Sequence, residues 1–137
     1  MKKIRIALVE ASAHSTHIFS RTYLPRVGIP TLGALLKEQG YACDIWFQAL
    51  PGYREERLLA YDIIGIGSLS STISDAYRLA GYLKSKGKVV VMGGPHVSFM
   101  PEEALTYCDY VVIGEGEVAF PALVDALSQG RAPDAVP

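Results

Sequence analysis

Short apolar runs alternate with amphipathic segments along most of this chain of 137 residues. Several runs are almost continuous in β-branched residues, which is typical of strands that helices cover on both faces. Strands and helices that alternate in this way form βα units, whose strands are parallel and whose crossovers are right-handed. We therefore expect strands at residues 4–9, 42–47, 63–67, 89–92 and 110–113.

Helical periodicity fills the intervals between these runs. Three of the periodic segments stop in front of a glycine, Gly40, Gly87 and Gly130, which is a common signal for the end of a helix. Helices are expected at residues 30–39, 55–61, 73–86 and 117–129, with a short one that begins at Pro101. The pattern predicts an α/β three-layer sandwich of the flavodoxin-like (Rossmann-like) class, with a five-stranded parallel sheet in the order 2-1-3-4-5.

Composition narrows the class of protein. Half of the residues are hydrophobic and a fifth are charged, which is typical of a globular domain and not of a disordered chain. The net charge of −1 and the absence of basic runs longer than two residues give no sign of a nucleic-acid partner. No segment has the length of a membrane span, and the apolar stretch that ends at Glu10 is too short for a signal peptide. Cys43 and Cys108 have no Cys-x-x-Cys spacing, so we expect free thiols and a cytoplasmic protein.

Glycine and small hydroxyl residues gather after three of the expected strands. The carboxyl ends of parallel strands meet at one edge of the sheet, where ligands bind in folds of this class. Glycine at such an edge allows close approach of a ligand and permits positive φ. The candidate binding residues are Gly67, Ser68, Leu69, Ser70, Ser71 and Thr72 after the third strand, Gly93, Gly94, Pro95 and His96 after the fourth, and Gly114, Glu115 and Gly116 after the fifth.

Other ligand sites of this fold class fit the sequence less well. The first loop has no Gly-x-Gly-x-x-Gly dinucleotide motif, and the chain has no Gly-Lys-Ser/Thr phosphate loop. A phosphoacceptor domain needs an aspartate where Gly67 and Ser68 stand. Ser12, Ser15 and Thr16 form a thin version of a flavodoxin phosphate loop, so a flavodoxin-like module for FMN, a nucleotide or electron transfer stays open as the alternative.

The glycine-rich turns together resemble a known family. The Gly-Gly-Pro-His run that begins at Gly93 and the Gly-Glu-Gly-Glu run that begins at Gly114 are similar to motifs of the N-terminal cobalamin-binding domain of cobalamin-dependent radical SAM enzymes. The resemblance covers about residues 3–130. It implies that residues 1–130 bind cobalamin, and that residues 131–137 form a linker to a downstream radical SAM domain.

The resemblance also implies which chemistry lies outside this chain. A radical SAM domain needs a Cys-x-x-x-Cys-x-x-Cys motif for its 4Fe–4S cluster, and the two cysteines here stand far apart. The cluster and S-adenosylmethionine are therefore expected only in the downstream catalytic domain, which would be the partner of this one. No catalytic residue is expected in the chain itself. The resemblance implies a full enzyme such as a methyltransferase, in which methylcobalamin supplies the methyl group.

The family's cobalt ligand is missing from this sequence. In the wider family the first loop carries Asp-x-His-x-x-Gly, whose histidine binds cobalt. If Gly28 is the last position of that motif, Tyr23 stands for the aspartate and Pro25 for the histidine. Proline cannot bind a metal, so the resemblance implies no protein ligand on the lower face of cobalt. His14 and His17 in the same loop are weak candidates for a substitute.

The other family positions match in part. The Ser-x-Leu motif corresponds to residues 67–69, where Leu69 matches and the first serine is lost, so one of the nearby hydroxyl groups would bond the displaced base or the corrin amides. Gly93 and Gly94 match, and in the family this pair lets the nucleotide tail pass close to the fourth strand. A valine at either position is expected to block the tail with little effect on the fold. Glu115 and Glu117 are expected to favour the positive end of the following helix.

Overall fold

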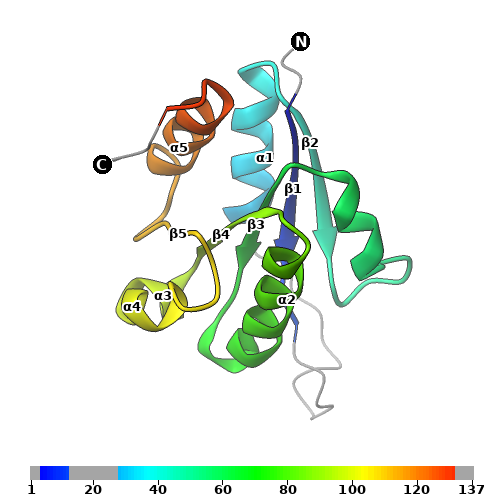
Figure 1. Cartoon of the computed structure of the whole chain (residues 1–137), viewed down its shortest axis with the longest axis vertical. Helices are drawn as coiled ribbons and strands as arrows, with labels where there is room; N and C mark the ends of the chain where they lie inside the picture. The colour runs from blue at the N-terminus through cyan, green and yellow to red at the C-terminus, as the bar shows by residue number, and fades with distance from the viewer. Residues whose placement is uncertain (1–3, 13–27, 132–137) are drawn as a thin grey trace.

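The computed structural model describes residues 4–12 and 28–131 and contains a five-stranded parallel sheet in the order β2-β1-β3-β4-β5 (Figure 1). This order confirms the predicted flavodoxin-like arrangement. The strands are β1 (Arg5–Glu10), β2 (Ala42–Phe47), β3 (Ile63–Gly67), β4 (Val89–Gly93) and β5 (Tyr110–Val111).

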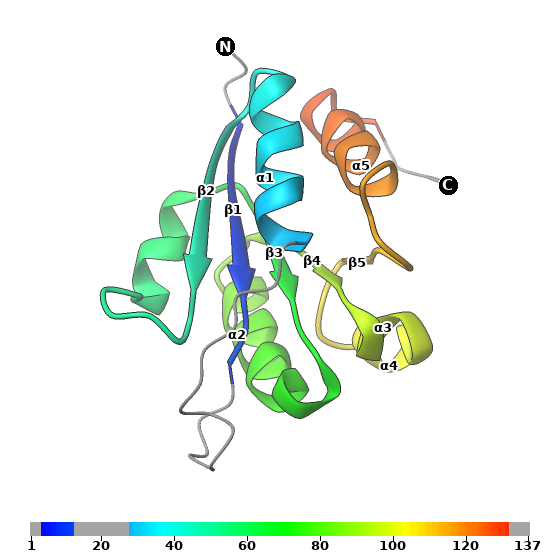
Figure 2. The ribbon, with the colours of Figure 1, turned by 180° about the vertical axis from the view of Figure 1, so that it is seen from behind.

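Helices cover both faces of the sheet, as Figures 1 and 2 show from opposite sides. One face carries α1 (Gly28–Glu38) and α5 (Ala119–Ser128), which also contact each other. The other face carries α2 (Ile73–Ser85) and a 3-10 helix, η2 (Glu55–Ala60). The remaining helices are short: η3 (Ser70–Thr72) precedes α2, and α3 (Pro95–Phe99) and α4 (Pro101–Ala104) connect β4 to β5.

The two-residue period of the strands divides the core into two clusters. In β1, Ile6 and Leu8 pack toward α1 and α5, whereas Ala7 and Val9 pack toward α2. Every residue of β3 is buried, as expected for a central strand between two helical layers. Among the described residues, no helix combines the length and the apolar character that a membrane crossing needs.

The structure differs from the sequence prediction mainly near the ligand-binding edge. The fifth strand ends at Val111, because the chain leaves the sheet after Val112, exposes Ile113 to solvent and turns at Gly114 with a φ of +84°. The last helix begins at Ala119 instead of residue 117, and Pro121 lies in its first turn, where a helix tolerates proline.

The helix α3 was not predicted. Gly94, with a φ of +116°, ends the path of β4, and Pro95 then stands at the first helical position, where its fixed φ suits a helix start. Five residues are too few to show helical periodicity in a sequence.

Candidate functional site

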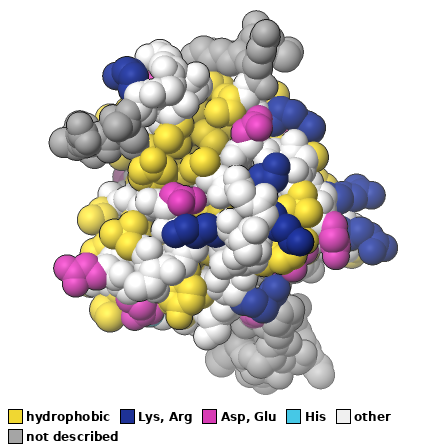
Figure 3. All heavy atoms as spheres, in the orientation of Figure 1, with side chains coloured by type: hydrophobic (Ala, Val, Ile, Leu, Met, Phe, Trp, Pro, Cys, Tyr) yellow, Lys and Arg dark blue, Asp and Glu magenta, His cyan; other side chains and the backbone are white. Residues whose placement is uncertain are grey.

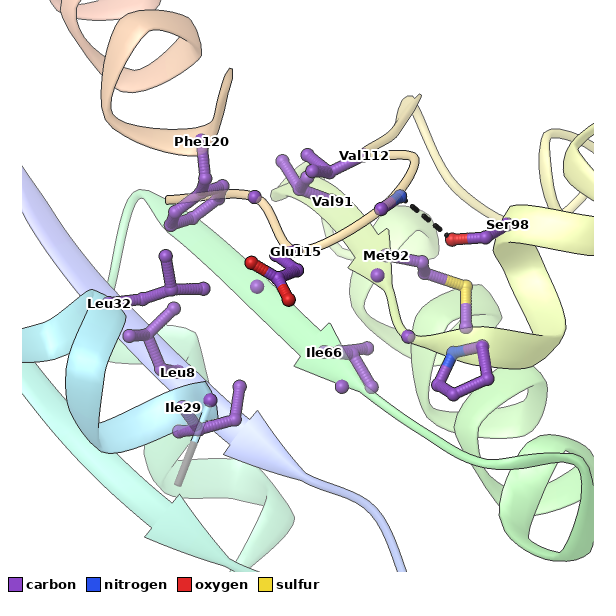
Figure 4. A pocket seen from close by; sticks show the side chains of 18 of the residues that line it. Leu8, Ile29, Leu32, Ile66, Val91, Met92, Ser98, Val112, Glu115 and Phe120 are labelled. Atoms are coloured by element: carbon purple, nitrogen blue, oxygen red, sulfur yellow. Dashed lines mark hydrogen bonds between the residues drawn. The ribbon is translucent and has the colours of Figure 1, made fainter. Parts of the chain in front are cut away.

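A pocket of about 510 Å³ opens at the carboxyl ends of the strands, on the face that α1 and α5 cover. Figure 4 shows Leu8, Ile29 and Leu32 on one side of it and Val91 and Val112 on the other. The volume lies within the usual range for small-molecule sites, which are mostly apolar with a few polar groups. The lining residues come from β1, α1, β3, β4 and its following loop, and the segment 112–120.

Glycines of two neighbouring strands form the floor of this pocket. Gly65, Gly67 and Gly93 all face α1 and α5, and Gly67 is paired with Gly93 in the parallel register of β3 and β4. A β-carbon at Gly65 would lie 2.9 Å from Leu8 and 3.1 Å from Phe120, so side chains already fill that place. At Gly93 the nearest such atom is the Val112 carbonyl oxygen at 3.9 Å. The floor is therefore open at Gly93.

Gly94 has a different function from its neighbour. With a φ of +116°, its ideal β-carbon would lie 2.1 Å from the carbonyl oxygen of Ser68. The Ser68 amide also donates a hydrogen bond to the Gly93 carbonyl at 3.2 Å, so the ends of β3 and β4 are in close contact here. The expectation that a valine at Gly94 leaves the fold intact is wrong, because it would meet backbone and not only a ligand.

The turn between β5 and α5 closes one side of the pocket. Gly114 and Gly116 both have positive φ, +84° and +80°, and the Gly114 amide donates a hydrogen bond to the Ser98 hydroxyl at 3.0 Å. Glu115 and Glu117 line the pocket and are exposed. Glu117 directly precedes Val118, the N-cap of α5, and neither glutamate lies in the first turn of that helix.

Three large apolar side chains near the pocket are mostly exposed. The exposed fraction is 85% for Phe99, which lines the pocket, and 64% and 76% for Ile113 and Val118, which flank the turn at 114–117. Figure 3, which views the molecule from the side of α2, shows hydrophobic side chains gathered on the surface in the region where Figure 1 draws α5. The exposed fractions of Phe99, Ile113 and Val118 show that there is apolar surface beside the pocket.

The serine-rich loop after β3 lies apart from the pocket lining. Ser68 is fully buried, and the Leu69 amide donates to the Thr72 hydroxyl at 2.9 Å within η3. Ser70 Oγ lies 3.0 Å from His96 Nδ1, and His96 Nε2 lies 3.3 Å from a carboxylate oxygen of Glu103. His96 therefore connects the loop after β3 to α4.

The partners of Glu103 also affect its ionisation. Its pKa is below its usual range, first because of the Tyr77 hydroxyl and second because of the His96 imidazole. The ring of Tyr77 stacks on Tyr107 with 4.1 Å between ring centroids and meets the His96 ring edge-on at 6.2 Å.

The structure brings about half of the predicted residues together. The predicted residues that line the pocket are Gly67, Gly93, Gly94, Pro95, Gly114, Glu115 and Gly116. The predicted residues that do not line it are Ser68, Leu69, Ser70, Ser71, Thr72 and His96. His14, His17, Tyr23 and Pro25 lie outside the described residues. Within the described ranges, no three side chains of His, Cys, Asp or Glu come together as a metal site.

Sequence reasoning missed the walls of the pocket. Leu8, Ile29, Leu32, Val91, Val112 and Phe120 line it, and each belongs to or packs against the core cluster on the α1 and α5 face. In the sequence they are ordinary core positions of strands and helices. The only feature that could mark these residues as pocket walls is that they lie next to glycines, which leave space unfilled by side chains.

Comparison with known proteins identifies the family. The family model described as the B12 binding domain matches residues 19–124. An uncharacterized methyltransferase of Pyrococcus horikoshii is 39% identical over 119 residues, which cover 78% of this chain and 26% of that protein. The bacteriochlorophyllide d C-8(2)-methyltransferase of Chlorobaculum tepidum is 39% identical over 71 residues, covering 52% of this chain and 16% of the enzyme.

A third relative has a different named activity. The anaerobic magnesium-protoporphyrin IX monomethyl ester cyclase of Rubrivivax gelatinosus is 29% identical over 140 residues, covering 93% of this chain and 25% of the enzyme. The chain thus spans about a quarter or less of the length of these three relatives.

A solved structure supports the fold. The N-terminal domain of a hypothetical protein from Thermotoga maritima has a TM-score of 0.54 and 18% sequence identity, over 86% of this chain and 95% of that domain. The parallel sheet, the glycine-floored pocket and the match over residues 19–124 agree with one another and confirm the family that the motifs indicated. The chain belongs to the B12-binding domain family.

Proposed function

We propose that this chain is the cobalamin-binding module of a radical SAM enzyme, most simply a methyltransferase, and that it contains no catalytic group. The family match supports cobalamin as the ligand. Two of the relatives are named as methyltransferases. Because the chain spans about a quarter or less of those proteins, a separate part of such an enzyme would supply the 4Fe–4S cluster and S-adenosylmethionine.

The open floor at Gly93 is the observation that carries this proposal. A ligand tail that enters between the sheet and the two helices must pass over β3 and β4, and a side chain at residue 93 would occupy that path. Gly67 and Gly93 are paired in the register of β3 and β4, so the smooth floor continues across both strands. Bound cobalamin would supply a cobalt-carried methyl group, whereas the residues of this chain bind and orient the cofactor.

The rim of the pocket fits the polar parts of the same ligand. Glu115 and Glu117 present carboxylate oxygens, which accept hydrogen bonds from the ribose hydroxyls and corrin amides of cobalamin. The exposed side chains of Phe99, Ile113 and Val118 offer apolar surface beside the pocket, and a macrocycle would shield them from water. The described residues thus fit an amphipathic ligand with a long tail.

A titration with hydroxocobalamin tests the proposal. Wild-type chain is expected to bind it and to change its visible spectrum, whereas Gly93→Val is expected to lose binding while it keeps its circular dichroism. Gly81→Val is the matched control, because Gly81 is exposed on α2 and a β-carbon there has no atom within 4 Å. Equal affinity of Gly93→Val and wild type would contradict the assignment of the floor. Binding of FMN in place of hydroxocobalamin would favour the flavodoxin-like alternative.

The downstream domain is a separate part of the proposal. Residues 131–137 would be a linker, and a cysteine motif for a 4Fe–4S cluster would follow it in the gene. Sequencing the gene beyond residue 137 tests this, and the absence of such a motif would limit the proposal to cobalamin binding.

A further inference from the structure

We infer that His96 is a positioning residue: it fixes the orientation of α3 and, through α3, the turn that closes one side of the pocket. This inference rests on the proposed function, because it takes the pocket as the ligand site. His96 itself does not line the pocket. Its effect on a ligand would therefore pass through the helix to which it belongs.

Packing alone holds α3 weakly in the fold. Of the five described residues of this helix, only Val97 is buried. A helix of this length is not stable by itself, so its place depends on contacts with the rest of the protein. One apolar contact does not prevent a helix from rotating about that point. The orientation of α3 therefore depends on the polar contacts of its other residues.

His96 makes polar contacts through both ring nitrogens. Its Nδ1 lies 3.0 Å from Ser70 Oγ, and its Nε2 lies 3.3 Å from a carboxylate oxygen of Glu103. Because a carboxylate only accepts, Nε2 of the neutral ring carries the proton, and Nδ1 accepts from the Ser70 hydroxyl. The ring also meets the ring of Tyr77 edge-on, with 6.2 Å between centroids. Three elements outside α3 thus hold this side chain, namely η3, α2 and α4.

The opposite side of α3 contacts the pocket. Ser98 stands two residues after His96, which is about 200° around a helix. Its hydroxyl accepts a hydrogen bond from the Gly114 amide at 3.0 Å, drawn as a dashed line in Figure 4. Pro95, Ser98 and Phe99 all line the pocket. A rotation of α3 would therefore displace Phe99 and break the bond to Gly114 at the same time.

These contacts connect three loops at one edge of the sheet. His96 bonds the connection after β4 to the loop after β3, and Ser98 bonds it to the turn after β5. Without the contacts of His96, a ligand would have to order the rim of the pocket as it binds, which costs conformational entropy. The expected loss of affinity is about three- to tenfold, which corresponds to one hydrogen bond.

The ligand-free chain of 137 residues tests the connection between the loops. In its ¹H–¹⁵N NMR spectrum, Ser70→Ala is expected to shift the signal of the Gly114 amide, because the change passes through His96 and α3. Ser74→Ala is the matched control, since Ser74 is an exposed serine in the first turn of α2. An unchanged Gly114 signal in Ser70→Ala, or an equal shift in both variants, would overturn the inference.

Calorimetric titration with hydroxocobalamin measures the effect on the ligand. His96→Ala is expected to raise the dissociation constant by about three- to tenfold. His96→Asn should restore part of the affinity, because its amide can still bond the Ser70 hydroxyl. This recovery should disappear when Ser70→Ala is present in both variants. An unchanged dissociation constant in His96→Ala, or a recovery that does not need Ser70, would overturn the inference and leave the proposed function intact.

Two further outcomes have a defined meaning. Failure of the wild-type chain to bind hydroxocobalamin would contradict the proposed function, whereas the Gly114 signal tests the role of His96 without a ligand. If His96→Ala does not fold by circular dichroism, Ser70→Ala takes its place in the titration, because Ser70 is exposed. Equal affinity of Ser70→Ala and wild type would then overturn the inference.

Discussion

The carbonyl oxygen of Ser68 lies where the β-carbon of any other residue at position 94 would have to stand, 2.1 Å away. The ends of β3 and β4 come this close because Gly94 has no side chain and adopts a φ of +116°. Gly93, its neighbour in the sequence, lines the pocket, and a β-carbon at Gly93 would point into open space. One glycine of the pair is thus required by the fold, and the other leaves room for a ligand.

The two glycines are expected to respond differently to alanine. Gly94→Ala should reduce the free energy of unfolding by about 1–3 kcal/mol for the backbone conformation alone, with a further loss from the displaced Ser68 carbonyl. Gly93→Ala should leave it unchanged or raise it by up to about 1 kcal/mol, because alanine loses less backbone entropy than glycine. Urea denaturation measures both. Equal destabilisation by the two variants would contradict this difference.

The pairing of His96 with Glu103 predicts a dependence of stability on pH. The pKa of Glu103 is lowered from 4.5, first by the Tyr77 hydroxyl and second by His96, so its contribution to stability is complete above pH 4.5 and is lost as the pH falls through the lower pKa of the folded state. Denaturation midpoints of wild type and Glu103→Gln should therefore differ at pH 6 and converge in acid. Glu102→Gln, in the same first turn of α4, is the control and should not show this convergence.

Both cysteines are expected to be unreactive in the folded chain. Cys43 and Cys108 are free, as the sequence predicted, and they are buried, which raises the pKa of each thiol to about 11. At pH 8 about one thiol in a thousand would be ionised, and neither is accessible. A thiol reagent should label the native chain slowly and both cysteines rapidly in denaturant. Rapid labelling of native protein would show that the chain opens locally near one of them.

The expectation that Pro25 takes the place of the family's histidine leads to a spectroscopic prediction. If no residue of the chain binds cobalt, bound Co(II) cobalamin should show no splitting from an axial nitrogen in electron paramagnetic resonance. The lack of a strong axial donor would also make Co(II) easier to reduce to Co(I). A triplet splitting that disappears in His14→Ala or His17→Ala would show instead that a histidine of the first loop binds the metal.

The sequence predicted two strands of this fold to the residue, β2 and β3. β3 is a short apolar run that is buried throughout, whereas β2 is an edge strand that is only partly buried and includes the exposed Asp44. The end of β5 was not readable, because Val112 and Ile113 continue the apolar run although one is buried and the other is exposed. The sequence shows that Val112 and Ile113 are both hydrophobic, but it does not show that the chain turns away from the sheet between them.

The glycines after the strands predicted where the pocket lies, but the sequence did not identify the apolar residues that form its walls. Nothing in the sequence distinguishes Gly93 from Gly94. In the structure they differ, because Gly94 has a positive φ and contacts the Ser68 carbonyl, whereas Gly93 has open space in front of it. Leu8 and Phe120 are typical core residues, so nothing local marks the part of each that faces the open floor. The hydroxyl groups of 68–72 follow the right strand, but the local helix η3 and the burial of Ser68 keep them out of the pocket lining.

The pairing of Gly67 with Gly93 has a consequence for the amount of folded protein in a cell. At the ends of two central strands, the layer of side chains that normally connects sheet and helix is missing, and a bound ligand would take its place. A ligand at a hundred times its dissociation constant would add about 2.7 kcal/mol to the free energy of unfolding. When the ligand is scarce, the empty chain unfolds more often and is more exposed to proteases. Its steady-state level would then follow the supply of the cofactor without any dedicated regulator.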